Sequence, residues 1–113
     1  MDLDEHGEID KAFRDVVNMT PAALDKWLDT EQSQEVGFTH EGEHESVGHH
    51  SGHRIIEIKN KKKTDLTDDD YAWMRKVVGY VHRHLAQKPD GDVTETRWRY
   101  SLMNWGHDPL KAA

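Results

Sequence analysis

Five histidines lie close together in one glutamate-rich segment, and imidazole and carboxylate groups are both metal ligands. The spacings His40-x-x-x-His44 and His49/His50-x-x-His53 can place two imidazoles on one ion. The segment has no strong helical pattern to hold the ligands in place. We prefer a polar loop with weak affinity for zinc, nickel or copper. The alternative is a specific metal site on His49, His50 and His53.

Positive side chains form three clusters in the second half of the chain. Cations beside an exposed indole can contact phosphates while the ring stacks on bases. The alternative is that these cations are solvated or pair with carboxylates of the same chain, such as Asp68–Asp70 or Asp108. The candidate nucleic-acid-binding residues are Lys61, Lys62 and Lys63 in one tract, Arg75, Lys76 and Arg83 on one helix face with small Ala72 and Gly79, and Arg97, Trp98 and Arg99.

The charge of the chain limits what these clusters can bind. Net charge is −7, and residues 1–53 carry thirteen acids against three Lys/Arg. Residues 54–113 carry nine acids and twelve Lys/Arg. The field of the whole chain therefore opposes adhesion to nucleic acid or anionic lipid. We expect any binding of DNA to be weak and to use the second half.

No complete catalytic constellation is present. The chain has no cysteine, which excludes thiol nucleophiles, thiolate metal sites and disulfides. Ser101, His107 and Asp108 lie near one another, but no nucleophile elbow surrounds Ser101. His84 falls within an apolar helix arc, where we expect a half-buried ring bonded to an acid or a carbonyl. We expect a protein without enzymatic activity and without a cofactor.

Length and composition indicate one domain that spans residues 1–113. Hydrophobic residues make up 35 % and charged residues 33 %, so the core should be modest. The N-terminus is acidic and carries no apolar signal segment, and no window is long enough to span a bilayer. We expect a cytoplasmic protein with no membrane partner.

Hydrophobic periodicity predicts an all-α fold, a compact bundle of about five helices. The first helix should cover residues 8–18. The second should begin at Thr20-Pro21, a good N-cap and first position, and end near Ser33. Residues 37–52, rich in His, Glu and Gly, should form a mobile loop. A third helix should begin at Ser46 or Ser51 and end in the lysine tract, and a fifth should begin at Thr94 and end at Gly106.

The fourth helix, from Thr67 to about Gln87, should be the long central one. Thr67-x-x-Asp70 is a variant of the capping box, and three aspartates in the first turn interact favourably with the helix dipole. A stripe at helical spacing should be buried, and further apolar side chains widen it to half the cylinder. So wide an arc implies contacts with at least two other elements. The stripe consists of Tyr71, Met74, Val78, Val81 and Leu85.

These segments resemble a known family. DLTDDDYAWMRKVVGYVHRHLAQKP followed by DVTETRWRYSLMNWGHDP is similar to the small bacterial domain-of-unknown-function family 3140. FRDVVNMTPAALDKWL and ESVGHHSGHRIIEI extend the resemblance from about Phe13 to Lys111. Some members of that family carry the label "DNA-binding protein" without an established activity. The resemblance implies a family and a hint about a partner, and it transfers no catalytic residues.

Three hypotheses about function follow. The first is a non-enzymatic binding module for nucleic acid. The second is a protein–protein adaptor, including a homodimer, that uses the wide apolar arc of the fourth helix. The third is a weak metal-binding protein that uses the His-rich segment.

Overall fold

The computed structural model describes residues 3–36 and 46–111, and within these ranges every regular element is helical. The predicted all-α fold is therefore confirmed. No helix in the described ranges is long and apolar enough to cross a membrane. The elements are α1 (Leu3–Val16), α2 (Pro21–Leu28), α3 (Glu31–Glu35), α4 (Val47–Asn60), the short 3-10 turn η1 (Lys63–Asp65), α5 (Asp68–Leu85) and α6 (Arg97–Asn104).

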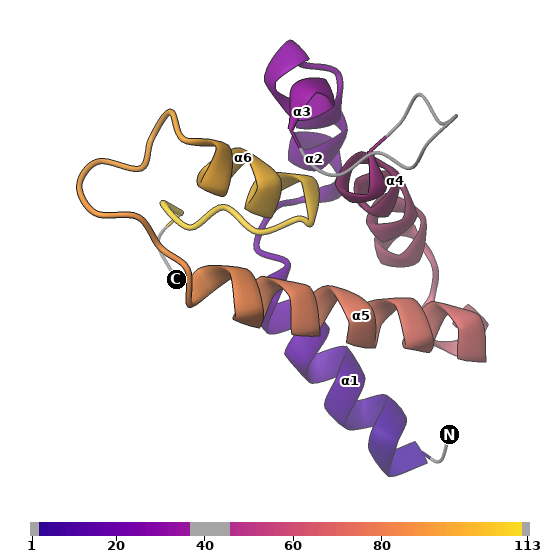
Figure 1. Ribbon diagram of the computed structural model, residues 1–113. Helices are drawn as coiled ribbons and strands as arrows, with labels where there is room; N and C mark the ends of the chain where they lie inside the picture. Colours follow the sequence, from indigo (N-terminus) through magenta and orange to yellow (C-terminus); the bar gives the residue numbers. More distant parts are fainter. Residues whose placement is uncertain (1–2, 37–45, 112–113) are drawn as a thin grey trace.

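The long helix α5 lies in the middle of the fold (Figure 1). Helix α1 crosses it on one side, and α4 and α6 contact it on the other. Helix α2 packs mainly against α4, and α6 also touches α2 and α3. The wide apolar arc of α5 thus packs against three neighbouring helices, in agreement with the prediction of at least two.

Hydroxyl N-caps set the starts of the helices and explain two corrections. The expected second helix does not continue to Ser33, because Thr30 accepts a hydrogen bond from the Ser33 N–H and begins a separate helix, α3. The chain therefore has six α-helices in its described part rather than about five. The last helix begins after Thr96 and not after Thr94, because the Thr96 hydroxyl accepts the Arg99 N–H.

The expected loop at residues 37–52 is wrong for residues 47–52, which form the first turns of α4. Ser46 caps this helix by accepting the His49 N–H. Glycine composition suggested a loop, but Gly52 is buried where helices meet. A Cβ built there would lie 2.6 Å from Leu28 Cδ2 and 2.8 Å from the Asn104 carbonyl oxygen. Residues 37–45 of that segment lie outside the described residues.

Burial of the predicted apolar stripe of α5 is confirmed for most of its residues, but the centre of the buried face differs from the prediction. Tyr71, Met74 and Val81 are buried, but Val78 and Leu85 are half-buried. Val77 is fully buried instead. The reason is geometric: Val77 lies roughly 30° from the middle of the apolar arc and Val78 roughly 70° from it, at 100° per residue.

A buried carboxylate joins α4 to α5. Asp70 is 0 % exposed, and its oxygens lie 2.6 Å from Arg54 Nη1 and 2.7 Å from Lys61 Nζ. Asp70 also accepts the Thr67 N–H at 3.0 Å while the Thr67 hydroxyl accepts the Asp70 N–H, which completes the predicted capping box. Burial by itself raises the pKa of Asp70, but hydrogen bonds from Lys61, Thr67 and Arg54 outweigh it and hold that pKa well below the ordinary value.

The shifted centre of the arc gives a first prediction. Val77→Asp should lower the free energy of unfolding by about 3 kcal/mol or more, because it places an unpaired carboxylate in the core. Val78→Asp should cost clearly less, since the new carboxylate can reach water. Urea denaturation of the two variants measures this difference. Equal losses for both variants would contradict the burial pattern of α5.

Asp70 gives a second prediction. Asp70→Asn should lower the free energy of unfolding at neutral pH by about 2 to 4 kcal/mol, because two cations lose their buried partner. The folded-state pKa of Asp70 is depressed, so its contribution is present above about pH 4 and is lost as pH falls toward the folded-state pKa. Urea denaturation at several pH values should therefore show the gap between wild type and variant shrinking below about pH 4. A gap independent of pH would refute this role.

Candidate functional site

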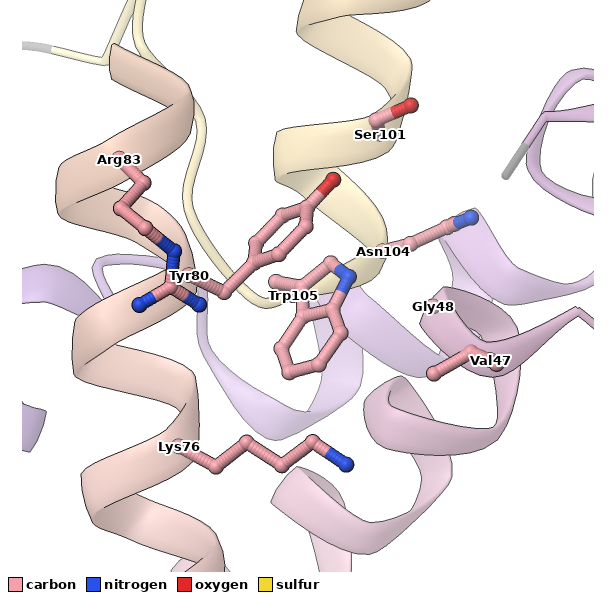
Figure 2. Close-up of a pocket in the computed structure, with 8 residues that line it drawn as sticks. All are labelled: Val47, Gly48, Lys76, Tyr80, Arg83, Ser101, Asn104 and Trp105. Atoms are coloured by element: carbon pink, nitrogen blue, oxygen red, sulfur yellow. The ribbon is translucent and has the colours of Figure 1, made fainter. Parts of the chain in front are cut away.

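A cavity of about 250 Å³ lies where α4, α5 and α6 meet. Figure 2 shows side chains from all three helices around it. The first turn of α4 forms one wall, the middle of α5 forms another, and the end of α6 forms the third. The lining residues are Val47 and Gly48 from α4, Lys76, Tyr80 and Arg83 from α5, and Ser101, Asn104 and Trp105 from α6 and its C-cap.

Aromatic rings in series make up one wall of the cavity and continue behind it. Trp105 stacks on Tyr80 with 4.2 Å between ring centroids and 16° between planes. Tyr80 stacks in turn on His84 at 5.3 Å, and His84 on Trp98 at 6.2 Å. Tyr80 and His84 meet because they are four residues apart on α5. The wall is therefore broad, apolar and supported from both helices.

His84 fixes the far end of this series. Its Nε2 lies 3.2 Å from the Trp98 carbonyl oxygen, and the Trp98 indole N–H donates to the His84 carbonyl at 2.7 Å. The expected half-buried histidine bonded to a carbonyl is thus confirmed. Burial lowers the pKa of His84, and the hydrogen bond to Trp98 offsets only part of that effect. The neutral ring is favoured, as suits a side chain with a structural role.

Asn104 holds α6 in place beneath the cavity. Its Oδ1 accepts the Trp27 indole N–H at 2.8 Å and the Ser33 hydroxyl, and its Nδ2 donates to the Ser33 carbonyl at 3.0 Å. The side chain is 1 % exposed, so these bonds satisfy a polar group that would otherwise be costly to bury. Because Trp105 follows Asn104 directly, the same bonds position the aromatic wall.

Two exposed cations, Lys76 and Arg83, border the cavity from α5 (Figure 2). Lys76 Nζ lies 4.6 Å from the centre of the Trp73 ring, a cation–π contact. The Arg83 guanidinium lies over Gly79, where an added Cβ would be 3.0 Å from Nη1. Within the described ranges neither cation has a carboxylate within ion-pair distance. The described lining also contains no Asp or Glu.

Tyr80 carries the polar tip of the aromatic wall. Burial raises the pKa of Tyr80, while a hydrogen bond with the Ser101 side chain and the charge of Arg83 partly oppose the shift. The phenol therefore stays protonated at neutral pH. The Tyr80 and Ser101 hydroxyls supply the cavity with neutral polar groups that can accept as well as donate.

The lysine tract divides in the structure. Lys61 is engaged with Asp70, and Lys63 Nζ lies 3.8 Å from Asp10 Oδ2. Lys62 is exposed. The tract precedes the first turn of α5, whereas Lys76 follows two turns later. Lys61 therefore has a structural role as a partner of Asp70, and only part of the tract remains available to a ligand.

The third predicted cluster is mostly occupied within the chain. Arg99 contacts both oxygens of Asp108, at 3.2 and 3.1 Å, and donates to the Thr94 carbonyl. This pairing with Asp108 was one of the two interpretations of the sequence. Trp98 is half-buried, and Arg97 is exposed. Arg75 is exposed on the outer side of α5 but does not line the cavity.

The predicted metal ligands lie on α4. His49 Nε2 is 2.7 Å from the Leu28 carbonyl oxygen, His53 meets the His49 ring edge-on at 4.9 Å, and His50 meets Trp73. No group of three potential metal-binding side chains occurs in the part of the chain that the structure describes. His40 and His44 lie outside that part. Metal binding by His49, His50 and His53 stays a prediction.

Sequence reasoning missed most of the cavity. Tyr80 and Trp105 were recognised only as members of apolar helix faces, and Asn104 carried no signal at all. Nothing in the sequence relates Val47 and Gly48 to residues more than fifty positions later. Of the nine predicted nucleic-acid-binding residues, the structure brings Lys76 and Arg83 to this cavity.

Comparison with known proteins supports the resemblance noted in the sequence. A family model described as "Protein of unknown function (DUF3140)" matches residues 12–103. Searches of the curated proteins and of the solved structures found no match to the chain. Because the family model covers most of the chain, from the end of α1 through nearly all of α6, the chain belongs to the DUF3140 family.

Proposed function

We propose that this protein is a non-catalytic binding module that contacts nucleic-acid phosphates through Lys76 and Arg83. The observation that carries the proposal is that these two cations are exposed, lack a carboxylate partner in the described ranges and flank an aromatic cavity. Phosphate contacts need accessible Lys or Arg, and bases need an aromatic surface nearby. Arg75, on the outer side of α5, adds to the same local charge.

Several other cations of the chain differ from Lys76 and Arg83, because they are paired with carboxylates. Arg54 and Lys61 neutralise Asp70, Arg99 holds Asp108, and Arg14 pairs with Asp10. A cation that already neutralises a buried or half-buried carboxylate has little charge to offer a phosphate. Lys76 and Arg83 are among the exposed cations that the described ion pairs leave for a partner, and both border the cavity.

Net charge sets the expected strength of binding. At −7 the whole chain repels polyanions, so affinity should be roughly micromolar or weaker at physiological salt and should fall as salt rises. Such binding is local and electrostatic. Weak affinity is part of the proposal.

The adaptor hypothesis has less support. The centre of the α5 arc on which it relied is covered by α1, α4 and α6. Among the described residues, Leu110 is the exposed large hydrophobic side chain. The arc itself therefore offers little apolar surface to a partner.

The proposal predicts that Lys76→Gln/Arg83→Gln weakens binding to nucleic acid by roughly tenfold at low salt. The slope of log K against log salt should also fall by about 0.7 to 0.9 for each lost phosphate contact. Fluorescence anisotropy with labelled oligonucleotides at several salt concentrations measures both quantities. Both side chains are exposed, so the melting temperature should change little.

Lys11→Gln/Lys26→Gln is the matched control, because it removes the same charge from exposed positions on α1 and α2. It should leave the affinity and the salt slope close to those of the wild type. Equal weakening by both double variants would show a general charge effect and would count against a site on α5. Absence of binding by the wild type at low salt would refute the proposal.

A further inference from the structure

The indole of Trp105 differs from the other three in its hydrogen bonding. Trp105 is 4 % exposed, yet its N–H donates to no described residue, and it faces the cavity beside Gly48 (Figure 2). An unpaired donor at the edge of a cavity is a ready contact for an acceptor that enters it. The other three indoles each donate to a partner in the chain: Trp27 to Asn104 Oδ1, Trp73 to Ser51 Oγ and Trp98 to the His84 carbonyl.

Gly48 keeps this N–H accessible. A Cβ at position 48 would lie 3.0 Å from Trp105 Nε1 and 3.4 Å from Asn104 Cβ, closer than a side chain packs without a shift of its neighbour. Because the residue is glycine, the first turn of α4 passes the indole without covering it. At position 48 the nitrogen therefore meets backbone rather than a side chain.

The polar groups of the cavity define the chemistry of a ligand. Lys76, Arg83 and the Trp105 N–H are donors, two of them charged, and the described lining has no carboxylate to oppose an anion. The walls are aromatic or aliphatic, with Tyr80 and Trp105 stacked together. A matching ligand has a flat apolar ring that carries acceptors and is attached to a negative group. A nucleobase with its flanking phosphates has these properties.

The size of the cavity limits how much of the ligand enters. About 250 Å³ is less than the roughly 300–1,000 Å³ of pockets that hold drug-sized molecules. One ring system fits this space, whereas a run of stacked bases does not. In a duplex every base is stacked and paired, and extruding one has an energetic cost. An unpaired strand presents a base without that cost.

We infer that the cavity is the subsite for one unstacked base of a single-stranded nucleic acid. The base lies at the edge of the Tyr80–Trp105 stack and accepts a hydrogen bond from the Trp105 N–H in the plane of the indole, while Lys76 and Arg83 contact the adjacent phosphates. This inference rests on the proposed function, and it specifies which form of nucleic acid the module takes.

The test compares three labelled probes of equal length: an oligothymidylate strand, the same backbone with abasic sites, and a duplex. Thymine offers two carbonyl acceptors. The strand should bind roughly five- to a hundredfold more tightly than the abasic backbone, the range expected for one base–aromatic contact. The duplex should bind no better than the abasic backbone. Anisotropy at low salt gives all three affinities.

The indole N–H signals in NMR spectra of the wild-type protein give an independent readout. The Trp105 signal should move on addition of the strand and stay nearly unchanged with the abasic backbone. The Trp27 signal, from an indole already bonded to Asn104, is the internal control. Trp105→Phe assigns the signal and should reduce the preference for the strand over the abasic backbone, because it removes the N–H donor. If that variant fails to fold, sequential assignment of the wild-type spectrum identifies the Trp105 signal, and the wild-type shifts still decide.

Each outcome separates the two proposals. Equal affinity for the strand and the abasic backbone, with both weakened by Lys76→Gln/Arg83→Gln, would overturn the base subsite and leave the proposed function standing. No binding of any probe would overturn both. A Trp105 shift as strong with thymidine monophosphate as with the strand would replace the strand by a free nucleotide.

Discussion

A buried carboxylate is the constraint on which the arrangement of the long helices depends. Asp70 is ionised and fully enclosed, and a charge in that position is tolerated only if it is closely compensated. The compensation comes from Arg54 on α4 and from Lys61 just after it, together with the N–H at the start of α5. The first turn of α5 is therefore fixed against the C-terminal half of α4.

The position of the cavity follows from that constraint and from a second one. With α5 fixed against α4, Tyr80 and the two cations face the N-terminal turn of α4. Asn104 then places α6 through its bonds to α2 and α3, which seats Trp105 against Tyr80. Each wall of the cavity is held by a buried polar group with few alternative partners. A site supported in this way does not depend on the packing of apolar side chains alone.

The distribution of charge reflects the same division of roles. Most acids lie in the first half of the chain, but two of the carboxylates that hold the fold together, Asp70 and Asp108, engage cations of the second half. Those cations stabilise the fold and leave the cavity's own cations unpaired within the described ranges. Trp73 and Gly79 keep Lys76 and Arg83 along the surface of α5, close to the aromatic wall. The cavity is therefore locally positive although the chain as a whole carries a net negative charge.

The sequence by itself determined the features that arise within one or two helical turns. The capping box at Thr67 and Asp70, the Thr20-Pro21 start of α2 and the helical periodicity of α5 are local, so they were predicted correctly. Short-range patterns did not decide that α4 begins before Gly48 or that Val77 lies deeper than Val78. Those outcomes depend on which helices pack against each face.

Only the tertiary structure decided which side chains meet. Asn104 reaches Ser33 across 71 positions of the chain, and Trp105 meets Gly48 and Tyr80 from two other helices. Which cations are paired and which are left for a ligand is settled by the same distant contacts. Sequence spacing carries no information about such pairs, because they are fixed by how whole helices dock, and docking minimises the exposure of many side chains at once.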